Sequence, residues 1–320
     1  MTDNTGDRKR EEILKEIWYD RICWSDAAGK LQSRIKFWRV VQMILAVAGA
    51  VLATAAATGL SPTHDQVLAA VGAMALLLVP IISTRLLPKE IVDGWPRARS
   101  VSEGLKSETF KFRAAVGEYA NKASDDADPA LAHFVGRTRS IKELGKDLAK
   151  YLPSRPSREK APPGQLTPES YLTERVNEQI EDYYRIKAEK NKSKAAFYRT
   201  LSTASIIAAA VASGLAAFNV LTPIGAWAAV ATTVGTIFAT HSAVNRFDKL
   251  ASSYAQQAGE LRQLTLEWRA KPNPSAPQVW SDFVIACEEA ISAENRSWMA
   301  RMMEDVKGID DVIKDMTGGK

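Results

Sequence analysis

Hydrophobic residues along this chain gather into four long stretches that carry almost no charge. Two of them cover residues 40–60 and 67–87, and the other two cover residues 201–220 and 222–243. Each is about the twenty residues that an α-helix needs to cross about 30 Å of hydrocarbon. The pattern predicts four transmembrane helices, because buried helices of soluble proteins are usually shorter and keep a polar face. A soluble bundle of Ala-rich helices is the alternative.

A seven-residue apolar repeat follows the second and the fourth of these stretches. The repeating positions are Ile91, Ala98, Leu105, Phe112 and Tyr119 in one case, and Phe247, Tyr254, Leu261 and Trp268 in the other. Such a repeat predicts a helix with one narrow apolar face that must find a partner. We expect each helix to continue from the preceding membrane helix as one rod. The name cytoplasmic seam is used below for Leu105, Phe112, Tyr254, Leu261 and Trp268.

Turn-forming residues divide the polar parts of the chain. The segments 121–130 and 271–278 are rich in Pro, Asp, Asn or Ser, and each is expected to end a long helix. A Pro-rich linker covers residues 153–168. By contrast, an apolar stripe formed by Ile17, Trp24, Leu31 and Trp38 predicts an N-terminal helix that runs directly into the first apolar stretch.

The two halves of the chain repeat a basic and aromatic pattern. The segments "KLQSRIKFWR" (30–39) and "KNKSKAAFYR" (190–199) align without a gap, and each precedes an apolar stretch. Farther along, Leu105 aligns with Leu261 and Phe112 with Trp268. The same unit of helix, membrane hairpin and two cytoplasmic helices is therefore predicted twice. The name membrane-entry signature is used for Phe37, Trp38, Arg39, Phe197, Tyr198 and Arg199.

The predicted fold is an all-α membrane protein with two tandem repeats and four transmembrane helices. The first repeat covers residues 1–152, with spans at about 40–60 and 67–87 and cytoplasmic helices at about 89–120 and 130–152. After the linker at 153–168, the second repeat covers residues 169–320, with spans at about 201–220 and 222–243 and cytoplasmic helices at about 244–270 and 279–312.

The distribution of basic residues predicts the orientation. The net charge is +5, yet the two hairpin turns, at 61–66 and 219–223, contain no Lys or Arg. This asymmetry predicts a multi-pass protein of the cell inner membrane with both termini in the cytoplasm. The basic excess fits a contact with anionic headgroups, so no nucleic-acid partner is expected. Residues 1–37 lack the pattern of a cleavable signal peptide.

Features of an enzyme are scarce. The chain has three His and two Cys, and Cys23 and Cys287 have no metal-ligand spacing around them. No P-loop, nucleophile elbow or Gly-rich phosphate turn occurs. The sequence therefore predicts no catalytic residue, no cofactor and no metal site, and both thiols are expected to be packed.

Polar residues in the second helix of each hairpin are the candidates for lining a pore. The hairpin turns are too short for a pore loop, so a pore would need helices from several subunits. The candidate residues are Thr84, Arg85, Thr233, Thr236, Thr240 and His241. Arg85 or protonated His241 at the pore mouth would favour anions. The alternative is ordinary helix packing by the threonines, with Arg85 extended toward the membrane surface.

This layout resembles the SLATT superfamily, small two-transmembrane-helix domains that accompany nucleotide-signalling and SLOG-type sensor systems in bacteria. The resemblance rests on the membrane-entry signature and on the heptad helix after each hairpin, as two tandem copies. It implies an oligomeric membrane pore or ion channel gated through its cytoplasmic helices and acting as a bacterial defence effector. Implied partners are further copies of the chain, the lipid bilayer, ions and a separate cytoplasmic sensor or nucleotide-signalling protein. The alternative is a non-conducting membrane scaffold that recruits partners.

Overall fold

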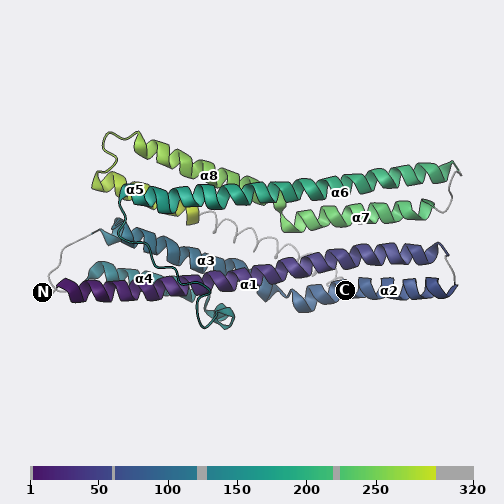
Figure 1. Ribbon diagram of the computed structural model, residues 1–320, viewed down its shortest axis with the longest axis horizontal. Helices are drawn as coiled ribbons and strands as arrows, with labels where there is room; N and C mark the ends of the chain where they lie inside the picture. The colour runs from purple at the N-terminus through teal and green to yellow at the C-terminus, as the bar shows by residue number, and fades with distance from the viewer. Residues whose placement is uncertain (1–2, 60–61, 121–127, 219–223, 293–320) are drawn as a thin grey trace, which may run out of the picture. The chain divides into compact units, whose positions relative to one another are not determined.

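The computed structural model describes residues 3–59, 62–120, 128–218 and 224–292, and every regular element in these ranges is helical (Figure 1). The chain forms two compact units. The helical unit comprises Met1–Gln32, Lys89–Ile186 and Ala255–Lys320, and the hairpin unit comprises Ser33–Pro88 and Lys187–Tyr254.

The hairpin unit contains two helical hairpins. Helix α1 (Asp3–Ala57) pairs with α2 (Pro62–Ile81), which ends in the π-helical turn η1 (Ile82–Leu86). Helix α6 (Ile186–Ala217) pairs with α7 (Ile224–Asn245), as Figure 1 shows. Helix α1 is continuous over 55 residues, so the prediction that the N-terminal helix runs directly into the first apolar stretch is confirmed.

The turn of the first hairpin is shorter than expected. Residues 61–66 were predicted as the turn, but α2 begins at Pro62 and therefore includes His64 and Asp65 in its first turn. Proline suits the first position of a helix because its missing N–H would have no intrahelical partner there. The carboxylate of Asp65 lies in the first turn, where negative charge interacts favourably with the helix dipole.

One group of helices in the helical unit comes from the first half of the chain. The N-terminal part of α1 packs with α3 (Lys89–Arg113) and α4 (Pro129–Glu143). A short 3₁₀ turn follows each of the latter two helices: η2 (Gly117–Tyr119) follows α3, and η3 (Lys146–Tyr151) follows α4. Their buried core consists of Leu14, Ile17, Trp24, Ala28, Ala98, Val101, Leu105, Phe112, Tyr119, Ala130, Phe134 and Leu148. These side chains stabilise the group by removing apolar surface from water.

A second group of helices comes from the second half. It contains α5 (Pro168–Tyr171), the π-helical segment η4 (Leu172–Arg185), α8 (Phe247–Arg269) and a helix over residues 277–292. Thr167 caps α5, because its side chain accepts from the Ser170 amide while the Ser170 hydroxyl accepts from the Thr167 amide. This capping box satisfies two backbone donors at the helix start.

The long helices α3 and α8 are not continuous with the hairpin helices before them, and the prediction of single rods was wrong. The first junction lies at Leu87 and Pro88, between η1 and α3. Proline disfavours the helical conformation of the residue before it, and Leu87 has φ −122° and ψ 50°. The second junction lies at Arg246, between α7 and α8, where φ is +54°. A positive φ cannot continue a right-handed helix.

The helices predicted to lie in the cytoplasm also end earlier than predicted. Helix α3 ends at Arg113 rather than near residue 120, because Ala115 and Gly117 both have positive φ. The helix expected at 130–152 is α4, which ends at Glu143, followed by the separate turn η3. The helix expected at 279–312 begins at residue 277, and its part after residue 292 lies outside the described residues.

Candidate functional site

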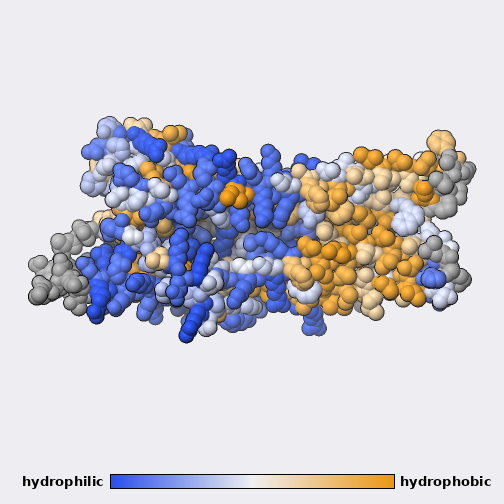
Figure 2. Space-filling view, viewed as in Figure 1, coloured by the Kyte–Doolittle hydropathy of each residue, from blue (hydrophilic) through white to orange (hydrophobic). Residues whose placement is uncertain are grey.

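The hairpin helices present apolar side chains on their surface. Among the described residues, three helices are long and apolar enough to cross a membrane: Gly6–Ala57, Thr63–Leu86 and Pro168–Ala217. At most 17% of the most apolar window of each is buried. Figure 2 shows these hydrophobic residues gathered over the hairpin helices. Exposed apolar patches of this extent mark a surface that lipid or protein covers, which indicates a membrane protein.

The fourth predicted span corresponds, in its described part, to α7. This helix contains no Lys, Arg, Asp or Glu, but it is not one of the three apolar helices above. Residues 222 and 223 of the predicted span lie outside the described residues.

Glycines bring the helices of each hairpin close together. A Cβ atom added at Gly49 of α1 would lie 2.6 Å from Cγ of Leu76 in α2. In the other hairpin, a Cβ at Gly235 of α7 would lie 3.1 Å from the Ser202 carbonyl oxygen in α6. Close backbone approach through small residues is a typical way for helices to associate in a membrane.

The threonines among the candidate pore residues are exposed in the single chain. Thr233 donates its hydroxyl to the Ala229 carbonyl at 2.9 Å, and Thr236 donates to the Thr232 carbonyl at 3.0 Å. Thr84 likewise donates to the Pro80 carbonyl at 2.9 Å. Thr240 is exposed on the same helix as Thr233 and Thr236. Each of the three bonded hydroxyls therefore still has lone pairs available as acceptors.

The two candidate charged residues have different environments. Arg85 lies exposed in η1. His241 is buried, and its ring centroid lies 4.9 Å from that of Tyr198 and 6.4 Å from that of Phe247. Positions that align in the sequence are therefore not equivalent in surroundings, because His241 packs against aromatic rings while Arg85 is exposed.

Both arginines of the membrane-entry signature contact the junction between α7 and α8. Arg39 donates to the side-chain oxygen of Asn245 at 3.3 Å and to the Val244 carbonyl at 3.5 Å. Arg199 forms an ion pair of 2.8 Å with Asp248.

The aromatic residues of the signature divide into exposed and packed ones. Tyr198 stacks on Phe247 with ring centroids 5.7 Å apart, whereas Phe37 and Phe197 are 59% and 58% exposed. Trp38 is half-buried and contacts Phe37 edge to face. The sequence did not indicate that two segments so far apart would meet the α7–α8 junction.

All five residues of the cytoplasmic seam are buried within the single chain. In the first half, Phe112 stacks on Phe134 with centroids 4.6 Å apart. In the second half, Trp268 stacks on Phe283 at 4.7 Å and donates its indole N–H to the Pro274 carbonyl. The apolar faces of α3 and α8 are thus covered by the helix that follows each of them.

A buried ion pair in the helical unit was not predicted from the sequence. Arg175 donates through Nε and Nη2 to the two carboxylate oxygens of Glu288, both at 2.7 Å, and neither side chain is exposed. The hydroxyl of Tyr171 donates to the same carboxylate at 3.1 Å. The sequence analysis could not identify this pair, because its two residues are 113 positions apart and neither belongs to a motif.

The two thiols are free cysteines that differ in burial. Cys287 is fully buried, and burial together with neighbouring Glu288 raises the pKa of its thiol. Cys23 is half-buried, and burial also raises the pKa of its thiol. Both groups are protonated at neutral pH, and only a thiolate is an effective nucleophile. Over the described ranges, no three His, Cys, Asp or Glu side chains are grouped to hold a metal ion.

Comparison with known families gave two matches. Residues 171–298 match the family model of the SMODS and SLOG-associating 2TM effector domain 1, and residues 20–127 match a protein family of unknown function, DUF4231. Neither curated proteins nor solved structures gave a match. Together the two family matches fit the SLATT superfamily, and the match at 171–298 indicates a membrane-associated effector.

Proposed function

We propose that this chain is a membrane effector that assembles with further copies of itself into an ion-conducting pore, gated through its helical unit. The observation that carries the proposal is the pairing of exposed apolar helices with an exposed row of hydroxyls. Thr233, Thr236 and Thr240 follow one another at three- and four-residue spacing on α7, which places them on one helix face. In an assembly, this face would line a water-filled path while the apolar faces contact lipid.

The proposal includes four membrane spans, with α7 as the fourth. Its 22 residues cover about 33 Å at 1.5 Å per residue, and it pairs with α6 through Gly235. A helix of modest hydropathy inserts more readily beside a strongly apolar neighbour, because its polar groups find protein partners there.

We further propose that the two halves of the chain are tandem repeats of one ancestral sequence pattern. Phe112 and Trp268 align in the sequence, and each stacks on an aromatic residue of the next cytoplasmic helix at nearly the same distance. Each half also supplies one hairpin and one group of helices to the two units. A closed ring of such chains would contain two similar repeats for each subunit.

The proposed orientation places both termini in the cytoplasm of a bacterial cell, with the protein in the inner membrane. It rests on the absence of Lys and Arg from both hairpin turns. The helical unit then faces the cytoplasm, where a separate sensor protein would reach it.

The second candidate function is a non-conducting membrane scaffold. The observation favouring it is that the hydroxyls of Thr233 and Thr236 already donate to carbonyls of their own helix. Threonines bonded in this way are common in membrane helices and need no water beside them.

A flux assay separates the two functions. Purified full-length protein is placed in liposomes loaded with an ion-sensitive dye, and particle images of the same sample count the subunits. A pore predicts dye response together with a ring of several subunits. A ring without flux, under every cytoplasmic condition that keeps the protein folded, contradicts the pore and supports the scaffold.

A further inference from the structure

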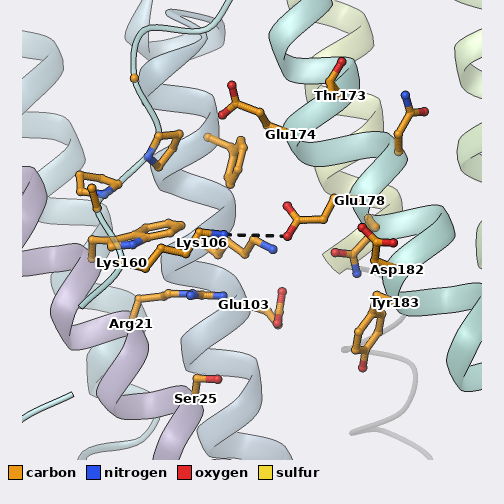
Figure 3. A pocket seen from close by; sticks show the side chains of 18 of the residues that line it. Arg21, Ser25, Glu103, Lys106, Lys160, Thr173, Glu174, Glu178, Asp182 and Tyr183 are labelled. Carbon is orange, nitrogen blue, oxygen red and sulfur yellow. Dashed lines mark ion pairs between the residues drawn. The ribbon is translucent and has the colours of Figure 1, made fainter. Parts of the chain in front are cut away.

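The helical unit contains a cavity of about 920 Å³. Its walls come from α1, α3, the Pro-rich linker and η4, all within this one unit (Figure 3). Trp18 and Arg21 line it from α1, Glu103 and Lys106 from α3, and Arg158 from the linker. A concave site of this size is in the range of small-molecule binding sites.

Three cations in this cavity have no carboxylate at ion-pair distance. Over the described residues, neither Arg21, Lys106 nor Arg158 forms an ion pair, and the ion pair drawn in Figure 3 joins Lys160 to Glu178 at 3.9 Å. Elsewhere in the helical unit, Arg175 is bonded to a carboxylate. Buried charges are usually paired, because desolvation of an unpaired ion is costly. Of the three, Arg21 is buried, so the lack of a bonded counter-ion is most costly for its guanidinium.

Unpartnered polar atoms point to the same place. Trp18 and Arg21 are 3% and 8% exposed, yet Nε1 of Trp18 and Nε of Arg21 have no hydrogen-bond partner in the described structure. Buried donors are nearly always satisfied in native proteins, so such a pair calls for an acceptor that enters the cavity. One carboxylate oxygen of Glu103 is also buried without a donor.

Glu103 lies with Arg21 and Lys106 on one side of the cavity, and further carboxylates line the other side. Figure 3 shows Arg21 and Lys106 on the side of α1 and α3, whereas Glu174, Glu178 and Asp182 extend from η4. These three carboxylates are exposed to solvent, which screens them. Arg21, by contrast, is buried, so solvent screens its charge less.

Burial opposes the ionisation of two lining groups, Lys106 and Glu103. Burial and then the charge of Arg175 lower the pKa of Lys106 to about 8. Burial opposes the ionisation of Glu103, but the nearby charges of Lys106 and Arg99 outweigh it, and the pKa of Glu103 is lowered. At neutral pH both groups are therefore charged.

We infer that this cavity binds a small phosphorylated molecule. Its phosphate is held by Arg21, Lys106 and Arg158, and a hydroxyl or amino group of the same molecule donates to Glu103. Phosphate oxygens accept from the unpartnered Nε of Arg21 and the indole N–H of Trp18. Guanidinium groups match phosphate geometry, and charge-assisted hydrogen bonds of this type are the strong ones.

Calorimetric titration of the full-length protein in detergent tests this site. The probes are inorganic pyrophosphate, ribose 5-phosphate and unphosphorylated ribose, with sodium sulfate at equal ionic strength as a reference. We expect saturable binding of both phosphate compounds, no binding of ribose, and no saturable binding of sulfate. The substitutions Arg21→Gln and Lys106→Gln should each weaken phosphate binding at least about tenfold.

Two variants keep the test decisive. Arg158 is an exposed residue of the linker. The substitution Arg158→Gln should therefore weaken phosphate binding without affecting the thermal unfolding midpoint. Arg139→Gln removes an exposed arginine of α4 that does not line the cavity, and it should leave binding unchanged. No binding of either phosphate compound, or equal binding by all four variants, overturns the proposal. Sulfate binding as tight as that of pyrophosphate also overturns it.

Discussion

Arg175 and Glu288 form a two-bonded ion pair in which both side chains are completely buried. The pair joins η4 to the helix over residues 277–292 and lies under the ring of Phe110, 4.8 Å from the guanidinium carbon. Two charges in such a place contribute favourably only together, because the loss of one leaves the other desolvated and unpaired. We therefore expect the pair to determine how these two helices pack against each other.

Removal of one partner should be much more harmful than removal of both. We expect Glu288→Ala to lower the free energy of unfolding by about 3–5 kcal/mol, and a double Arg175→Leu, Glu288→Leu variant to lower it much less. Denaturant unfolding in detergent, followed by tryptophan fluorescence, measures both. Glu289→Ala, at an exposed neighbouring position, serves as the control. Equal losses for the single and the double variant would show that the ion pair is not coupled.

A charge on the cytoplasmic seam should disrupt the helical unit. Leu261 is 0% exposed in α8, and Leu266 on the same helix is 61% exposed. Leu261→Asp places an unpaired charge in an apolar contact, so we expect a loss of several kcal/mol, whereas Leu266→Asp should have little effect. Membrane insertion should survive, since both positions lie outside the apolar stretches. Fractionation of cells and thermal unfolding measure the two results, and equal stability of the variants would contradict the burial of this face.

The close approach at Gly235 predicts that its substitution separates α6 from α7. A leucine there would collide with the Ser202 carbonyl and the Ser205 side chain, at a cost of about 1–3 kcal/mol. Gly214→Leu is the matched control, because a Cβ atom at Gly214 meets nothing within 4 Å. Limited proteolysis and thermal unfolding in detergent should detect a loosened second hairpin in the Gly235→Leu variant alone. A similar response of both variants would mean that α6 and α7 do not pack through Gly235.

The proposed orientation can be tested with engineered cysteines on intact cells. Ser61, which lies outside the described residues, belongs to the turn predicted from the sequence, and Ser154 is an exposed position of the linker. Ser61→Cys should react with an impermeant thiol reagent added outside, whereas Ser154→Cys should react only after the cells are opened. The reverse labelling pattern would place the helical unit outside the cell.

If the chain conducts ions, Arg85 is the residue whose charge should influence selectivity. Arg85→Glu replaces a positive by a negative charge near the proposed pore mouth, so reversal potentials should shift toward cation selectivity. His241→Glu should act in the same direction, but burial of that residue makes loss of folding the larger effect. Thr236→Val removes a hydroxyl and should alter conductance more than selectivity.

Bilayer recordings of these variants measure both quantities, with Arg139→Glu on α4 as the control for a distant charge reversal. Conductance with a reversal potential that Arg85→Glu leaves unchanged would show that Arg85 lies outside the ion path.

Local patterns in the sequence determined the helical and membrane character of this protein. The absence of charge over about twenty residues predicts a membrane helix wherever it occurs, and the stripe of Ile17, Trp24 and Leu31 correctly predicted one continuous helix α1. These features depend only on neighbours within a helix, so no tertiary contact was needed to find them.

The tertiary structure decided the points at which distant segments meet. The predicted rods are interrupted at Leu87 and Arg246, because the backbone at these residues is not helical. The tertiary structure buried His241 against Tyr198, although the sequence-aligned Arg85 is exposed. The buried ion pair joins Arg175 and Glu288, which are more than a hundred positions apart in the sequence. The sequence cannot indicate which charges pair, because each ion is well solvated by itself in water. Pairing becomes necessary only when folding removes the water around both ions.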